Sequence, residues 1–176
     1  MKRITFSLIF ILFSLAFLTA QEKSSIQWKS MQEAIDMNPK EGKLIFVDAY
    51  TDWCGWCKRM DQTTFLDSAV ISVLNEHFIP VKFNAEGSEV ITHNGKSYEN
   101  PNPGRTRSTH TFTYFLLGQR FGYPSFAFLD VNNNVIGVLP GYQKPEQLLN
   151  VLKYFHTDAY KTSTYDEWTK SQSVQE

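Results

Sequence analysis

Cys54 and Cys57 are the two cysteines of the chain, and they lie in the segment Trp53-Cys54-Gly55-Trp56-Cys57-Lys58. Two thiols at this spacing, at the start of a helix, can close a small disulfide ring. Unpaired backbone N–H groups and the positive end of the helix dipole would stabilise the thiolate of the first cysteine and lower its pKa. Such a thiolate attacks a partner disulfide, and the second cysteine then releases the mixed disulfide. The spacing therefore favours thiol–disulfide exchange.

Two other interpretations of the cysteine pair compete with redox chemistry. A structural zinc site usually requires four ligands. The histidines that could complete one do not pair at ligand spacing; they are His77, His93, His110 and His156. A silent disulfide is compatible with an exported protein, but a bridge across two residues constrains the unfolded chain little. Redox chemistry is therefore favoured over a silent disulfide, and a silent disulfide over a metal site.

The composition is that of one globular domain. The chain has 176 residues, within the usual range for a single domain. Its 17 basic and 18 acidic residues give a net charge of −1, which argues against a nucleic-acid-binding surface. Two cysteines are too few for a disulfide-rich scaffold, and a chain of this length needs no structural metal to fold. The cysteine pair is therefore where we expect the chemistry.

The first 20 residues have the pattern of a secretory signal peptide. Lys2 and Arg3 form a basic start, and residues 4–18 are apolar except for three hydroxyl side chains. The apolar run is shorter than the about 20 residues that span a membrane, and Ala20 precedes the polar Gln21. We expect cleavage after Ala20 and an exported, periplasmic or extracytoplasmic protein. An uncleaved N-terminal anchor is the alternative.

The elements around the cysteines alternate between helix and strand. Apolar residues from Met31 onward follow helical spacing until Pro39 and Gly42, which are expected to end the helix. Leu44–Tyr50 is a continuous apolar run with one acid, typical of a strand buried on both faces. A helix is expected to begin near Cys54. Further elements are expected at residues 68–77 (helix), 79–84 (strand), 111–119 (short helix), 125–129 and 135–139 (hairpin strands) and 145–155 (final helix).

The domain is expected to span residues 21–160. Two segments depart from the alternating pattern, one inside this domain and one after it. Residues 85–110 are rich in turn formers and poor in large apolar side chains, so we expect a loop insertion that serves partner choice and stays out of the core. Residues 161–176 form a polar tail, in which Tyr165 and Trp168 either dock a short helix or belong to a frayed terminus. The order of elements specifies an α/β sheet with helices on its faces.

The region around the cysteine pair resembles the thioredoxin superfamily. A strand precedes the W-C-G-W-C-K motif, and Asp48 lies six residues before Cys54, where thioredoxins carry a buried acid. Lys82 stands in the next strand at the place of the lysine that pairs with that acid, and Tyr123-Pro124 matches the segment of the family's cis-proline. The resemblance covers about residues 26–155. The Gly-Trp dipeptide between the cysteines is more similar to exported bacterial thioredoxin-like proteins with a CGWC motif than to cytosolic thioredoxins.

The resemblance implies a thioredoxin-like fold, with a central mixed sheet and helices on both faces, and an extracytoplasmic thiol–disulfide oxidoreductase. Cys54 would be the attacking nucleophile and Cys57 the resolving thiol of a redox-active disulfide. Asp48, coupled to Lys82, would move protons for Cys57. The residues expected to contact a bound polypeptide are Trp53, Trp56, Tyr123 and Pro124.

The expected partners follow from the same chemistry. No cofactor or metal is needed, because the dithiol itself carries the electrons. Protein thiols and disulfides are the expected substrates, and a membrane redox partner would reset the dithiol. Whether the protein reduces, oxidises or isomerises its clients stays open, with reduction favoured. The alternatives are a redox-silent binding or chaperone-like module of the same fold and, less favoured, a metal-delivery protein.

Overall fold

The sheet at the centre of the protein is mixed. The computed structural model describes residues 25–119 and 121–173, so the predicted signal peptide lies outside the described residues. Four strands pair in the order β2-β1-β5-β6. They are β1 (Leu44–Tyr50), β2 (Phe78–Asn84), β5 (Ser125–Leu129) and β6 (Val135–Pro140). β1 is parallel to β2 and antiparallel to β5, which pairs antiparallel with β6.

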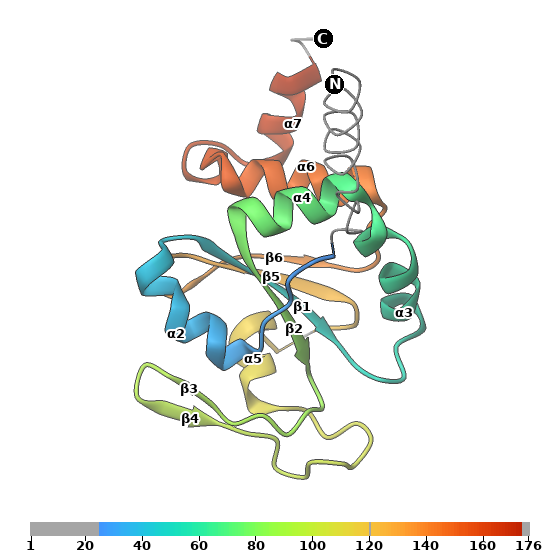
Figure 1. The fold of residues 1–176 in the computed structure, drawn as a ribbon, viewed down its shortest axis with the longest axis vertical. Helices are drawn as coiled ribbons and strands as arrows, with labels where there is room; N and C mark the ends of the chain where they lie inside the picture. Colours follow the sequence, from blue (N-terminus) through green and yellow to red (C-terminus); the bar gives the residue numbers. More distant parts are fainter. Residues whose placement is uncertain (1–24, 120, 174–176) are drawn as a thin grey trace, which may run out of the picture.

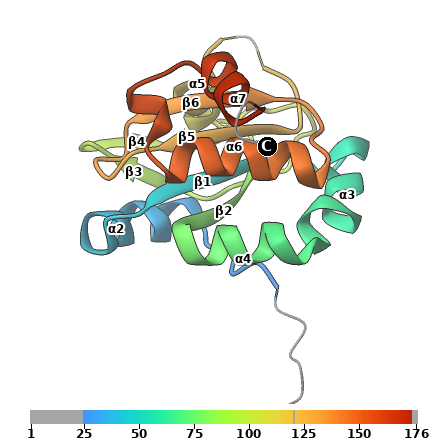
Figure 2. The same ribbon diagram turned by 90° about the horizontal axis from the view of Figure 1, so that it is seen from above.

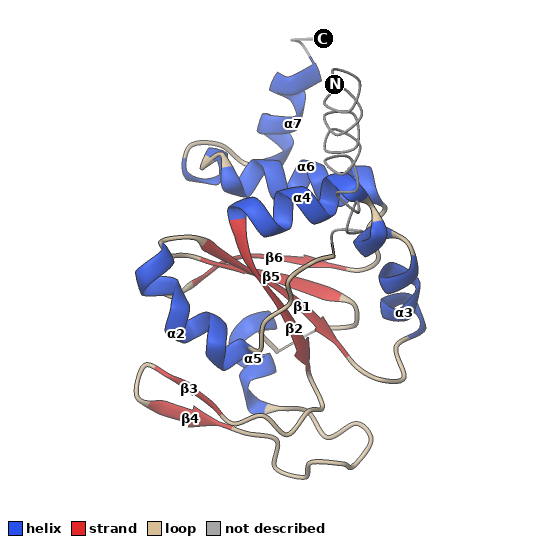
Figure 3. Ribbon diagram, viewed as in Figure 1, coloured by secondary structure: helices blue, strands red, loops and turns tan. Residues whose placement is uncertain are grey.

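Helices cover both faces of this sheet (Figures 1 and 3). The α-helices are α2 (Met31–Glu41), α3 (Gly55–Gln62), α4 (Ser68–His77), α5 (Thr111–Leu117), α6 (Pro145–His156) and α7 (Tyr165–Ser173). Residues of α2 and α5 pack on one face, and those of α3, α4 and α6 on the other. The expected α/β arrangement is confirmed. In the described parts of the chain, no helix is long and apolar enough to cross a membrane.

β1 lies inside the sheet because its apolar side chains can be buried on both faces. Ile45 and Val47 join the core beneath α2 and α5, whereas Phe46 joins the core beneath α4 and α6. The ring of Phe46 stacks on Phe126 of β5 at a centroid distance of 5.5 Å. The strand is thereby fixed on both sides, and its C-terminal end at Tyr50 leads into the cysteine segment.

Residues 85–110, expected to stay out of the core, contribute to it. Two short strands, β3 (Ile91–His93) and β4 (Lys96–Tyr98), pair as an antiparallel hairpin. Ile91 is fully buried in the core beneath α2 and α5, and the His110 ring bonds the Glu89 carbonyl at 2.7 Å. The expectation was wrong because a few buried side chains and paired polar groups order a segment of low apolar content.

The C-terminal segment forms a docked helix, one of the two outcomes considered for residues 161–176. Tyr165 and Trp168 of α7 pack on Tyr154 of α6, at centroid distances of 5.4 and 5.6 Å. Thr164 and Glu167 form a reciprocal capping arrangement at the start of α7. Figure 2 shows α7 beside α6 on the helical layer that also contains α4. The helix continues to Ser173.

Helix α2 continues past Pro39, although the sequence predicts that this proline ends the helix. Proline lacks the N–H that would bond the carbonyl four residues earlier, which belongs to Ile35. That carbonyl instead accepts a hydrogen bond from Asn133 Nδ2 at 3.3 Å. The helix ends at Gly42, whose left-handed backbone lets its N–H bond the Asn38 carbonyl at 2.9 Å. The tertiary contact therefore compensates for the missing bond.

Candidate redox site

Cys54 and Cys57 form a disulfide at the start of α3. Cys54 is the N-cap residue, in extended backbone, and its sulfur accepts a hydrogen bond from the backbone N–H of Cys57 at 3.1 Å. A thiolate at this position would be stabilised by that N–H group and by the helix dipole. The predicted helix start is confirmed.

The disulfide is shielded, whereas the tryptophans beside it are exposed. The exposed fractions of Cys54 and Cys57 are 4% and 3%, against 52% for Trp53 and 62% for Trp56. The ring of Trp53 meets that of Tyr123 at a centroid distance of 6.0 Å. The ring of Trp56 lies tilted against that of Tyr142, which the sequence did not indicate, at a centroid distance of 5.2 Å. Two aromatic pairs therefore flank the disulfide.

The Tyr123–Pro124 peptide bond is cis, as predicted. The carbonyl of Pro124 accepts a hydrogen bond from the N–H of Gly141 at 2.8 Å, which joins the start of β5 to the end of β6. Burial raises the pKa of Tyr123 to about 12, so its phenol stays protonated at neutral pH. Tyr123 therefore presents an uncharged ring beside Trp53.

Asp48 and Lys82 are direct partners in the β1–β2 ladder, and Lys82 Nζ lies 2.7 Å from Asp48 Oδ2. The other carboxylate oxygen, Oδ1, is buried and has no hydrogen-bond partner among the described residues. Burial raises the pKa of Asp48 to about 6, although the charge of Lys82 opposes this shift. A carboxyl group with a pKa near 6 can accept and return a proton close to neutral pH.

Asp61 of α3 binds the same ammonium group and was missed by the sequence analysis. Burial lowers the pKa of Lys82, but Asp48 and Asp61 outweigh it, and the pKa of the lysine is raised overall. The ring of Phe65 adds a cation–π contact, 4.9 Å from Nζ. Lys82 thus connects the buried acid of the sheet to the helix that begins at the cysteine pair.

Glu86 connects the segment at residues 85–110 to the same site. Its Oε1 accepts a hydrogen bond from Trp53 Nε1 at 3.0 Å. Its backbone carbonyl accepts one from Asn100 Nδ2 at 2.8 Å, and Asn100 also bonds Ser108 within the segment. The segment therefore helps to hold Trp53 in place, while its role in partner choice stays a prediction.

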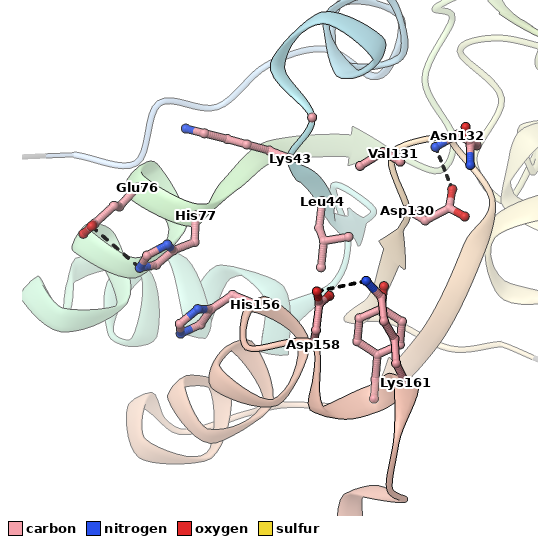
Figure 4. Close-up of a pocket in the computed structure, with 12 residues that line it drawn as sticks. Lys43, Leu44, Glu76, His77, Asp130, Val131, Asn132, His156, Asp158 and Lys161 are labelled. Carbon is pink, nitrogen blue, oxygen red and sulfur yellow. Dashed lines mark hydrogen bonds and ion pairs between the residues drawn. The ribbon is translucent and has the colours of Figure 1, made fainter.

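A separate cavity of about 620 Å³ lies at the other end of β1 from the disulfide. His77 and His156 stack on its wall at a centroid distance of 4.2 Å, although they are far apart in the sequence (Figure 4). Burial and the neighbouring His77 lower the pKa of His156. Within the described residues, no group of three or more His, Cys, Asp or Glu side chains is arranged to hold a metal ion.

The sheet order, the helices on both faces and a disulfide at the N-terminus of the helix after β1 define a thioredoxin-fold protein of the disulfide-oxidoreductase type. The family model for the thioredoxin-like domain matches residues 31–156. The chain belongs to this family, as its resemblance to the thioredoxin superfamily predicts.

The chain is also similar to individual proteins. A solution structure of a candidate disulphide-isomerase from Bacteroides thetaiotaomicron is 27% identical, with a TM-score of 0.54, and the match covers 76% of this chain and 94% of that one. The thiol:disulfide interchange protein DsbD of Actinobacillus pleuropneumoniae serotype 5b (strain L20) is 28% identical over 83 residues, 43% of this chain and 14% of DsbD. Spermatogenesis-associated protein 20 of Rattus norvegicus is 36% identical over 55 residues, 31% of this chain and 7% of that protein. The chain thus spans a small part of these two longer proteins.

Proposed function

We propose that the protein is an extracytoplasmic thiol–disulfide oxidoreductase that exchanges disulfides with protein substrates through Cys54 and Cys57. The observation that carries the proposal is the position of Cys54 Sγ at the start of α3, 3.1 Å from the backbone N–H of Cys57. A neutral disulfide sulfur gains little from this contact, whereas an attacking thiolate is stabilised by it. The similarity to part of DsbD, a thiol:disulfide interchange protein, supports the same class of reaction.

In the reducing direction, the exchange proceeds in two steps. The Cys54 thiolate attacks one sulfur of a client disulfide, which forms a mixed disulfide and releases the other client sulfur as a thiolate. The Cys57 thiol then loses its proton and attacks Cys54 Sγ, which restores the Cys54–Cys57 disulfide and releases the second client thiolate. Two electrons pass from the dithiol to the client. Oxidation of a client is the same sequence in reverse.

The second step requires a proton acceptor, because Cys57 is nearly buried and its thiolate would be costly to form. We assign this role to Asp48, whose pKa of about 6 leaves it mostly ionised at neutral pH. Lys82 and Asp61 act as positioning residues, because Lys82 binds the Asp48 carboxylate and Asp61 of α3 binds the same ammonium group.

Polypeptide clients fit the surface around the disulfide. Trp53 and Trp56 offer exposed apolar rings on its two sides, and such a rim suits an unfolded or extended chain. Tyr123, held by Pro124 just before β5, would pair its backbone with that chain by strand addition. A membrane redox partner that resets the dithiol belongs to the same proposal.

Export is proposed from the N-terminal sequence, where Lys2 and Arg3 precede an apolar run that is too short for a comfortable membrane span. Intact mass spectrometry of the protein from its native cell tests the proposal. We expect a chain that starts at or near Gln21. A mass that retains residues 1–20 would favour the uncleaved anchor instead.

Trapping of clients tests the exchange reaction. In a Cys57→Ser variant the attack by Cys54 persists but the resolving thiol is gone, so mixed disulfides should accumulate as high-mass bands that vanish on reduction. The matched control is Cys54→Ser, which leaves a thiol one turn into the helix with less dipole stabilisation. We expect no bands from the control. Equal trapping by both variants would contradict the assigned roles, and no trapping by either would favour the redox-silent binding module.

A further inference from the structure

One flank of the disulfide is a cavity that combines aromatic rings with cations. It has a volume of about 630 Å³ and is lined by Gly55, Trp56, Arg59, Tyr142 and Lys144. The rings of Trp56 and Tyr142 lie 5.2 Å apart and form its apolar wall. Gly55 follows the reactive Cys54 directly in the chain. The cavity is therefore lined by two residues, Gly55 and Trp56, that lie between the cysteines in the chain.

Both charged side chains that line this cavity are positive. Arg59 and Lys144 are exposed, and among the described residues the ion pairs involve neither of them. Lys144 is the N-cap residue of α6, so the positive end of that helix dipole adds to the same potential. The acidic residue of the first turn, Glu146, does not line the cavity.

The opposite flank carries more negative charge. A cavity of about 310 Å³ beside Trp53 is lined by Asp52 and Glu86, with Arg105 as its one lining cation. Glu86 is fixed there by its hydrogen bond from Trp53 Nε1. The charged side chains that line the two cavities therefore have opposite net sign, negative beside Trp53 and positive beside Trp56.

We propose that the cavity lined by Trp56, Arg59, Tyr142 and Lys144 is a specificity subsite for an acidic side chain of the client, close to the client cysteine. The proposal rests on the function proposed above and adds a substrate class to it. A glutamate would place its carboxylate between the guanidinium of Arg59 and the ammonium of Lys144. Its methylene groups would lie against the two rings. Because the charges are exposed, the preference acts mainly on the rate of encounter and weakens with salt.

Synthetic peptides test the subsite. Each peptide carries one cysteine in a mixed disulfide with neutral 2-mercaptoethanol, and has glutamate, glutamine or lysine at positions two and three on each side of the cysteine. The reduced protein should release thiol from the glutamate peptide with a kcat/KM about three- to tenfold above that of the glutamine peptide, at low salt. The lysine peptide should be slower than the glutamine peptide. All three values should converge in about 0.5 M NaCl, where the Debye length is only a few ångströms.

A double variant, Arg59→Gln with Lys144→Gln, should remove the preference for glutamate and leave the rate with the glutamine peptide within about twofold. The matched control, Lys40→Gln with Lys153→Gln, removes two exposed cations that do not line either flanking cavity. It should keep the preference. Circular dichroism confirms that each variant folds.

The outcomes separate the two proposals. Equal rates with all three peptides, a preference for lysine, or a glutamate preference that survives in the Arg59→Gln, Lys144→Gln variant would overturn the subsite and leave the redox function standing. No reduction of any peptide by the wild-type protein would overturn the redox function, and the subsite with it.

Discussion

Asp48 of β1 and Lys82 of β2 lie opposite each other in a parallel ladder, and their side chains form an ion pair 2.7 Å long on the face that α3 covers. The carboxylate is almost fully buried, whereas one fifth of the lysine side chain is exposed. An acid in this setting is costly to keep charged, even beside a cation. We therefore expect the charged carboxylate to weaken the fold at neutral pH.

The stability of the fold should reflect this cost. The pKa of Asp48 is raised from 3.8 to about 6, so between about pH 4 and pH 6 the folded protein binds more protons at this site than the unfolded chain. The contribution of Asp48 to the free energy of unfolding therefore falls as pH rises through this range. We expect Asp48→Asn to be about 1–3 kcal/mol more stable than wild type at pH 7.

Urea unfolding of the oxidised protein at several pH values measures this difference. The difference between Asp48→Asn and wild type should be small near pH 4 and should grow until about pH 7. A pH-independent difference, or an Asn variant that is less stable at pH 7, would show that Lys82 compensates fully for the burial of the carboxylate.

The same residue should control the second chemical step. Asp48→Asn should leave the attack by Cys54 unchanged and slow the release of the mixed disulfide, since the buried Cys57 thiol loses its proton acceptor. In wild type the release rate should rise with pH around pH 6, where Asp48 ionises. Stopped-flow kinetics between pH 5 and pH 9 would follow both steps.

Asp61→Asn is the control for this kinetic prediction. It removes a carboxylate that binds Lys82 but leaves Asp48 in place, so it should shift the pH dependence of release without abolishing it. Unchanged release by Asp48→Asn across the whole range would remove Asp48 from the mechanism.

The hairpin in residues 85–110 should matter for folding. Ile91 is fully buried beneath α2 and α5, so Ile91→Ala should lower the free energy of unfolding by about 2–5 kcal/mol. The neighbouring Val90 is 57% exposed and provides the control, because Val90→Ala should change stability by less than about 0.5 kcal/mol. Denaturant unfolding compares the two. Similar small effects would restore the interpretation of this segment as a loop outside the core.

Any side chain at Gly137 of β6 should lower the stability of the fold. A Cβ atom there would lie 2.5 Å from Cζ of Phe155 in α6, so Gly137→Ala should destabilise the fold by about 1–3 kcal/mol. Gly122→Ala is the control, since its Cβ would meet nothing within 4 Å. Adding Phe155→Leu should recover part of the loss in a double-variant cycle of thermal unfolding. Additive effects of the two substitutions would place the strain elsewhere.

Strong local signals explain which parts of the fold could be predicted. The continuous apolar run of Leu44–Tyr50 can form little other than a buried strand, and the structure places it inside the sheet. The pairing of Asp48 with Lys82 came from the family resemblance, because a sequence alone does not give the register of two strands. Parallel register depends on the helices between the strands, which the local pattern leaves undetermined.

Weaker signals account for what was missed. Asp61 lies four residues after Cys57 in the same helix, so both occupy one face, and that spacing could have drawn attention to it. The dipeptide Asn94-Gly95 is typical of a tight hairpin turn, and it lies between the three-residue strands β3 and β4. The strands on either side were too short to show an alternating pattern. The stacking of His77 on His156 joins the ends of two helices, and no local pattern could indicate it.

The equilibrium of the Cys54–Cys57 disulfide with a thiol buffer tests the central claim most directly. The oxidised protein is incubated with graded ratios of reduced to oxidised glutathione or dithiothreitol, and the free thiols are counted by alkylation and mass spectrometry. A redox-active pair should be reduced and reoxidised reversibly, with a potential between about −270 and −120 mV. Resistance to reduction, with a potential below about −300 mV, is the property of a structural disulfide and would contradict the proposed function.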